Sequence, residues 1–119
     1  MSILIYIDPN VDLHTKEFVQ IIIEFRISPA HVAIIKNPQL SLEKATEQVE
    51  QSHRDFLEEL NKFLGEKQYP YAIIESYKRS FNGVALELQG MTVQKLLSSR
   101  LIKAIYVNRE IRIPETPIM

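Results

Sequence analysis

The sequence SYKRSFNGVALEL, residues 76–88, places an Asn-Gly pair between two segments that read as extended chain. Tyr and Ile are frequent before the pair, and residues 84–88 after it alternate large apolar side chains with a small or a charged one. A two-residue type I′ turn needs positive φ at both central positions, and Asn-Gly tolerates this best. We therefore predict a β-hairpin that turns at Asn82 and Gly83, with Phe81 packing at one end of it.

The chain before this hairpin predicts one strand and one long helix. Apolar residues occupy every second position of residues 19–27, which is typical of a strand with one buried face. Pro29 and Pro38 then bracket a connection. Ser41 is a favourable N-cap for an amphipathic helix, and Gly65 suits the C-terminus of that helix.

A shorter helix and a last strand follow the hairpin. Thr92 is expected to cap the helix, and residues 102–108 read as the strand. With hairpin strands at residues 71–80 and 84–88, the order becomes strand, helix, strand, strand, helix, strand. This order predicts an α+β, ferredoxin-like β-α-β-β-α-β fold, whose four-stranded antiparallel sheet carries two helices on one face and leaves the other face bare. Residues 1–17 would form an N-terminal arm or an extra strand.

Composition excludes several classes of function. The 119 residues are enough for one domain. The 14 basic and 15 acidic residues give a formal net charge of −1, so the basic footprint of a nucleic-acid-binding protein is missing. Without cysteine, neither a disulfide nor a thiolate metal site can form. The apolar runs are far shorter than the roughly 20 residues that span a bilayer, so we expect a protein or small-molecule partner, and neither nucleic acid nor a membrane.

Candidate metal and nucleotide sites have little support in the sequence. Asp8, Asn10 and Asp12 have the spacing of a calcium loop, but Leu13 stands where that loop needs glycine and Val19 where it needs glutamate. The histidines lie in separate segments without paired ligand spacing, and the glycines are too isolated to form a phosphate-binding loop. We predict no metal, no cofactor and no catalytic residue.

The motif Tyr77-x-x-x-Phe81-Asn82-Gly83-x-Ala85, followed by a capped helix and a final apolar strand, resembles the propeptide domains of subtilisin-like serine proteases. These domains also occur as free inhibitors. The resemblance covers residues 18–108 and is strongest to the prodomains of large secreted or cell-wall-associated bacterial proteases. The chain departs from the family pattern in three places: it has Val84 in place of a second aromatic, Leu101-Ile102 in place of Gly-Val, and a longer link over residues 28–40.

This resemblance implies a non-enzymatic prodomain of a secreted or cell-surface protease precursor, preceded by a signal peptide. It would act as an intramolecular chaperone and as an inhibitor of the catalytic domain, in cis or in trans. Members of the family dock the bare sheet face on two parallel surface helices of the protease. In this chain, alternation along the strands assigns the following residues to that face: Gln20, Ile22, Glu24, Glu75, Ala85 and Glu87.

Residues 109–119 are expected to form an extended tail that enters the protease cleft. The residues assigned to the cleft are Arg109, Glu110, Ile111, Arg112 and Ile113.

One or more of the carboxylates at Glu24, Glu75 and Glu87 could meet the N-termini of the protease helices, where unsatisfied N–H groups favour negative charge.

Two other readings stay open at this level. The bare face could instead bind a small ligand or a second copy of the chain. A small hydrolase of the same architecture is a third reading, but it would need a phosphate-cradling loop and a placed Arg-Asn pair, and the sequence offers neither.

Overall fold

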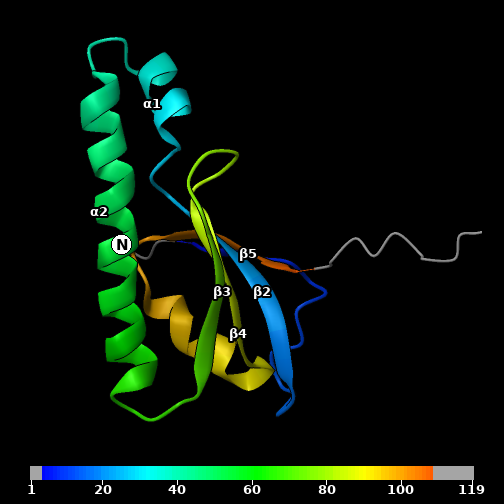
Figure 1. The fold of residues 1–119 in the computed structure, drawn as a ribbon. Helices are drawn as coiled ribbons and strands as arrows, with labels where there is room; N and C mark the ends of the chain where they lie inside the picture. Colours follow the sequence, from blue (N-terminus) through cyan, green and yellow to red (C-terminus); the bar gives the residue numbers. More distant parts are fainter. Residues whose placement is uncertain (1–3, 109–119) are drawn as a thin grey trace, which may run out of the picture.

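The computed structural model describes residues 4–108 (Figure 1). The elements in chain order are β1 (Tyr6–Ile7), β2 (Phe18–Phe25), α1 (Ala30–Lys36), α2 (Leu42–Leu60), η1 (Asn61–Gly65), β3 (Tyr71–Tyr77), β4 (Gly83–Gln89), η2 (Gly90–Ser98) and β5 (Ile102–Val107). The α+β class is confirmed. The predicted numbers of strands and helices are wrong. This part of the chain has five strands and three helices, which are α1, α2 together with its continuation η1, and η2.

The sheet has the strand order β1-β5-β2-β4-β3. All pairings among β5, β2, β4 and β3 are antiparallel, as the ferredoxin-like arrangement requires, whereas β1 pairs with β5 in parallel. The added strand arises because the chain before β2 passes along the outer edge of β5, where the N–H of Asp8 donates to the Ile105 carbonyl (2.8 Å). The sheet is therefore mixed, with β1, from the segment expected to be an arm or an extra strand, added to the four strands of the predicted sheet.

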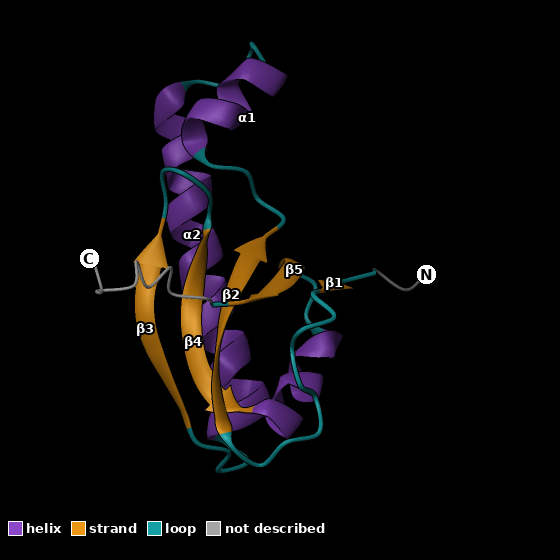
Figure 2. Cartoon of the chain, turned by 90° about the vertical axis from the view of Figure 1, so that its right-hand side faces the viewer, coloured by secondary structure: helices purple, strands orange, loops and turns teal. Residues whose placement is uncertain are grey.

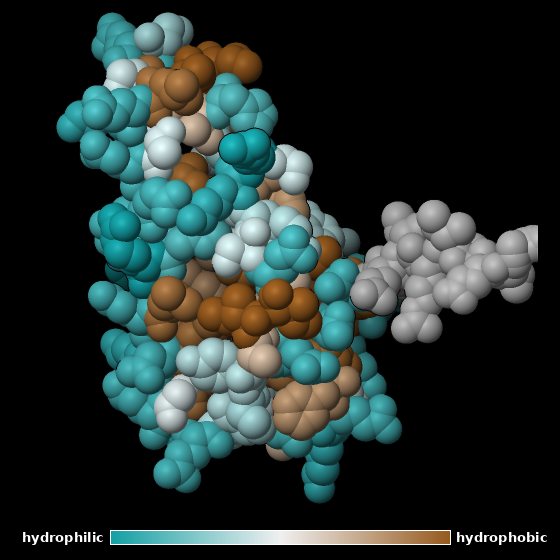
Figure 3. All heavy atoms as spheres, viewed as in Figure 1, coloured by the Kyte–Doolittle hydropathy of each residue, from teal (hydrophilic) through white to brown (hydrophobic). Residues whose placement is uncertain are grey.

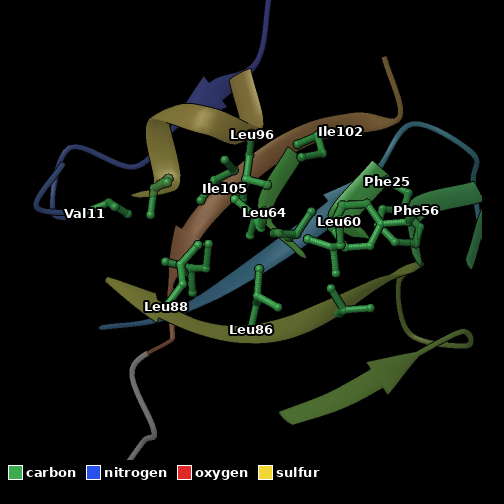
Figure 4. Close-up of a cluster of buried hydrophobic side chains, with 14 residues drawn as sticks. Val11, Phe25, Phe56, Leu60, Leu64, Leu86, Leu88, Leu96, Ile102 and Ile105 are labelled. Atoms are coloured by element: carbon green, nitrogen blue, oxygen red, sulfur yellow. The ribbon is translucent and has the colours of Figure 1, made fainter. Parts of the chain in front are cut away.

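One face of the sheet carries the hydrophobic core, and α2 lies behind that face in Figure 2. The long helix and η2 cover the same side, as predicted (Figure 1). Figure 4 shows the buried side chains that meet between these layers. The core residues come from the arm, the three inner strands and the helices: Val11, Ile21, Ile23, Phe25, Phe56, Leu60, Leu64, Val84, Leu86, Leu88, Val93, Leu96, Ile102 and Ile105.

The N-terminus of the long helix is as predicted. Ser41 is the N-cap, and its Oγ accepts from the Lys44 N–H (3.1 Å). The last turn differs, because α2 ends at Leu60 and the chain continues as the π-helical turn η1 to Gly65.

The predicted cap at Thr92 is wrong. The helix η2 is a 3₁₀ helix that begins at Gly90, and no side chain caps it. Its first N–H groups are instead satisfied by the arm, because Gly90 donates to the Glu17 carbonyl (3.0 Å) and Met91 donates to the Thr15 carbonyl (2.9 Å). The Thr92 Oγ1 is buried without a hydrogen-bond partner.

The connection expected between Pro29 and Pro38 contains a helix that sequence reasoning missed. Helix α1 follows Pro29 directly and packs beside the N-terminal half of α2, beyond the end of the sheet (Figure 1). None of its side chains is buried. With only seven residues, it is too short to show the repeated spacing of three, four and seven that identified α2.

The predicted turn at Asn82-Gly83 is also wrong. Strand β3 ends at Tyr77 and β4 begins at Gly83, so the hairpin loop comprises residues 78–82. Among residues 4–108 Gln68 alone has a positive φ, and no glycine does. A type I′ turn at Asn82 and Gly83 is thus excluded, and the fold requires these two residues for another reason.

The side chain of Asn82 is buried and joins three parts of the fold. Its Nδ2 donates to the Ile27 carbonyl (3.0 Å) and to Oγ of Ser52 on α2 (2.9 Å). Its Oδ1 lies 2.8 Å from Nε2 of His53, which therefore carries the shared proton. The backbone carbonyl of Asn82 accepts from the Phe25 N–H (2.8 Å). Asparagine is needed because its short amide both donates and accepts in one buried place.

Gly83 is required by the distance between β4 and β2. A Cβ at this position would lie 1.9 Å from the carbonyl oxygen of Ile23, a backbone atom that cannot turn aside. Residue 83 can therefore carry no side chain while the two central strands keep their pairing.

Replacing the buried amide tests how much this junction contributes to stability. We expect Asn82→Ala to lower the free energy of unfolding by about 3 kcal/mol, because it leaves buried groups of Ile27, Ser52 and His53 without their partner. The matched control is Asn61→Ala, an exposed asparagine, which should change it by about 0.5 kcal/mol or less. Urea unfolding measures both, and a loss below about 1 kcal/mol for Asn82→Ala would contradict this role.

Candidate functional site

The face of the sheet opposite the core forms a continuous surface whose residues follow from the strand register. Three cross-strand rows make it up, and we call these residues together the open face. The first row is Tyr6, Ala104, Glu24, Gly83 and Tyr77; the second is Tyr106, Ile22, Ala85 and Glu75; the third is Gln20, Glu87 and Ala72. Figure 2 shows this side of the sheet in front of α2.

The six residues assigned to this face from the sequence differ in accessibility. Gln20 and Glu75 are exposed, and Ile22, Glu24 and Glu87 are half-buried. Ala85 is fully buried by its neighbours, so it contributes to the floor of the surface and offers no side chain of its own to a partner.

A cluster of side chains on the open face is built around Glu24, and the sequence prediction identified only part of it. The hydroxyl of Tyr106 donates to Oε1 of Glu24 (3.2 Å), and Nζ of Lys103 lies 3.6 Å from Oε2. Burial, together with the charge of Glu24, raises the pKa of Tyr106, so its hydroxyl stays neutral and can donate. Alternation along residues 102–108 could have placed Tyr106 here, whereas the position of Tyr6 depends on an unpredicted strand pairing.

An aromatic pair lies at the end of the open face beside the β3–β4 loop. The rings of Tyr77 and Phe81 have centroids 4.7 Å apart. A Cβ at Gly83 would also lie 2.9 Å from Phe81, so the Phe81 ring covers this glycine. Phe81 thus packs at the end of the hairpin, as predicted, but it does so on the open face and outside the hydrophobic core.

Two of the three carboxylates on the face lack partners in the described chain. Glu75 and Glu87 make no ion pair or side-chain hydrogen bond within residues 4–108, whereas Glu24 has both. Off the face, Glu50 is paired with Lys78 (2.9 Å). The hydrogen bond and the charge of Lys78 lower the pKa of Glu50.

Features of other kinds of site are scarce in the described chain. No three His, Asp or Glu side chains come together within residues 4–108 as a metal site would need. No helix in this range is long and apolar enough to cross a bilayer. The predicted cleft residues of the tail, residues 109–113, lie outside the described range. A groove of about 600 Å³ runs between α1, α2 and the β3–β4 loop, away from the open face.

An uncovered sheet face that carries aromatic side chains is typical of a protein-binding module. The family model described as peptidase inhibitor I9 matches residues 22–114, and the chain belongs to this family of subtilisin propeptide inhibitors. The resemblance stated from the hairpin motif is therefore confirmed. Neither the curated proteins nor the solved structures contain a significant match to the chain.

The position of Phe81 sets its energetic role. Because its ring is half-buried and touches Tyr77 outside the core, we expect Phe81→Ala to lower the free energy of unfolding by about 1 kcal/mol. Phe25→Ala is the matched comparison, and it should cost about 4 kcal/mol because that ring is buried against Phe56. Equal losses in urea unfolding would show that Phe81 is a core residue after all.

Proposed function

We propose that this domain is the prodomain of a secreted subtilisin-like serine protease. It docks the open face on the catalytic domain, places residues 109–119 in the active-site cleft, and assists folding of the protease. The observation that carries the proposal is the combination of membership in the I9 inhibitor family with a sheet face that no part of residues 4–108 covers. The domain itself is non-catalytic, and its precursor would be exported.

The width of the open face supports docking on a pair of helices. Five strands span four inter-strand spacings of about 4.8 Å, or about 19 Å in all. Two helices packed side by side have axes about 9 Å apart and are each about 10 Å across, or about 19 Å from edge to edge, so both fit within the width of the sheet. The partner implied by the family, two parallel surface helices, therefore matches this face in size.

Charge supports the same partner. Glu75 and Glu87 project from the face without compensating cations in the described chain, so each is available to N–H groups at a helix N-terminus. Glu24 is the weaker candidate, because Lys103 already neutralises it and Tyr106 occupies one oxygen.

The end of β5 is held in a defined position, from which the tail would continue to the partner. The N–H of Asn108 donates to the Gln20 carbonyl (3.0 Å), so the chain is held to β2 up to the last described residue. Residues 109–113 would then bind the cleft by strand addition, using backbone N–H and C=O groups. Arg109, Glu110, Ile111, Arg112 and Ile113 are the residues proposed to do so.

Chaperone and inhibitor activity would follow from the same contacts. A module that binds the folded protease, but not its unfolded chain, stabilises the folded state by mass action. It speeds folding if it also binds the transition state. Once the protease has folded, the tail blocks access of substrate to the cleft.

Inhibition of a purified subtilisin tests the proposal. We expect the full chain to inhibit peptide hydrolysis, and deletion of residues 109–119 to raise the inhibition constant at least tenfold, roughly the loss when one of two linked binding elements is removed. The free energy of unfolding of both forms is the control. Equal inhibition by the two forms would remove the tail from the mechanism, and failure of the full chain to bind or inhibit would contradict the proposed function.

The alternative of self-association has one observation in its favour. A band of hydrophobic atoms crosses the middle of β3 in Figure 3. Ile73 and Ile74 of this edge strand are 39% and 44% exposed, and Leu57 on the neighbouring helix α2 is 50% exposed.

Sedimentation equilibrium distinguishes the two functions. We expect a monomer over the whole accessible concentration range, because the β3 edge is irregular between Ile73 and Glu75 and does not offer an even ladder to a second copy. A dimer that dissociates on Ile74→Lys, but not on the control substitution Ile35→Lys on α1, would favour self-association through this edge instead.

A further inference from the structure

We infer that the N-terminal arm, residues 4–17, is part of the protease-binding surface and that Tyr6 contacts the protease directly. This inference rests on the proposed function and extends its binding site to a segment outside the family match, which begins at residue 22. It follows from how the arm is fixed, where Tyr6 lies, and how far the arm extends the face.

The first part of the arm is held against β5. Tyr6 and Ile7 are in register with Ala104 and Ile105, and the N–H of Asp8 continues this ladder. One step earlier, Nη2 of Arg26 donates to the Leu4 carbonyl (2.8 Å). Backbone bonds on both sides of Tyr6 therefore fix its Cα position.

The second part of the arm is fixed against the core and η2. Val11 is buried among the core residues. Thr15 and Glu17 accept from the first N–H groups of η2, and Nε2 of Gln94 donates to the Leu13 carbonyl (2.8 Å). Gly90 allows this close approach, because a Cβ there would lie 2.2 Å from the Asp12 carbonyl oxygen. The arm is thus an integral part of the fold over its described length.

Tyr6 stands at one end of the first row of the open face, and Tyr77 stands at the other end. Between them lie Ala104 and Gly83, with the paired Glu24 at the centre. The row therefore has a tyrosine on each edge strand, and between them the half-buried Glu24 is flanked by two small residues. β1 extends the sheet by one inter-strand spacing of about 4.8 Å, and Tyr6 lies on this added strip of the face.

The ring of Tyr6 is prepared for binding. It is 55% exposed and lies 5.8 Å from the ring of Tyr106, whose hydroxyl is held by Glu24. Tyrosine has few rotatable bonds and a large apolar ring, so a ring that is already supported loses little entropy when a partner covers it. Tyrosine is one of the residue types most frequent among those that carry most of an interface's affinity.

The test is Tyr6→Ala in the full chain, assayed as the inhibition constant against purified subtilisin and as the dissociation rate of the complex. We expect the inhibition constant to rise at least tenfold, mainly through faster dissociation, because a large aromatic contact is lost. Thermal unfolding should be unchanged within about 2 °C, since more than half of the side chain is exposed. Tyr6→Phe should retain inhibition within about twofold, because the ring provides the contact.

The control is Ile35→Ala on α1, an apolar residue that is 76% exposed and lies off the open face. It should leave the inhibition constant unchanged. If the full chain inhibits and Tyr6→Ala inhibits equally well, the arm is not part of the interface and the inference is wrong, while the proposed function stands. If the full chain neither binds nor inhibits, both are overturned.

Discussion

The buried amide of Asn82 is the interaction on which the rest of the structure depends. Asn82 lies in the loop that precedes β4, and its side chain bonds to the segment that follows β2 and to α2. The helix layer and the two central strands therefore meet at one side chain. Gly83, the next residue, allows β4 to approach β2 without a side chain between them. The helix layer is thereby fixed on one face of the sheet, and the register of β2 and β4 then determines which residues occupy the other face.

In the two strands that meet at this junction, the residues that stabilise the fold are distinct from the residues of the open face. The inward residues of β2 and β4 belong to the core, while the outward residues alternate with them in the same strands. A rigid core therefore holds the open face in shape, and truncation of an outward side chain removes little packing. Such an arrangement suits a module that must present a preformed surface to a partner, because little ordering entropy is lost on binding.

Much of this fold could be predicted from the sequence, because period-two alternation in residues 19–27 and 84–88 and the capped helix after Ser41 are local signals. The reason for the Asn-Gly pair could not be predicted, because the same dipeptide fits two incompatible structures. One is a tight turn with positive φ, and the other is a buried amide beside a close contact between strands. The Thr92 cap failed for a similar reason, since carbonyls of the arm, some 75 residues away in sequence, satisfy the N–H groups that a cap would bind. The face assigned from alternation lacked Tyr6, because β1 pairs in parallel with a strand at the far end of the chain. It also lacked Tyr106, which alternation along residues 102–108 could have placed.

The parallel strand β1 has a second consequence, which concerns the edges of the sheet. Without the arm, β5 would be an edge with regular N–H and C=O groups, open to pairing with any extended chain. Hydrogen bonds to β1 cover the middle of that edge, and Oδ2 of Asp8 accepts from the N–H of Val107 (3.3 Å) at its end. The other edge, β3, is interrupted between Ile73 and Glu75, which disfavours a matched ladder. With both edges made unsuitable for strand pairing, the broad open face is the part of the described sheet that stays available to a folded partner, and docking through it is the mode of binding that we propose for this propeptide inhibitor.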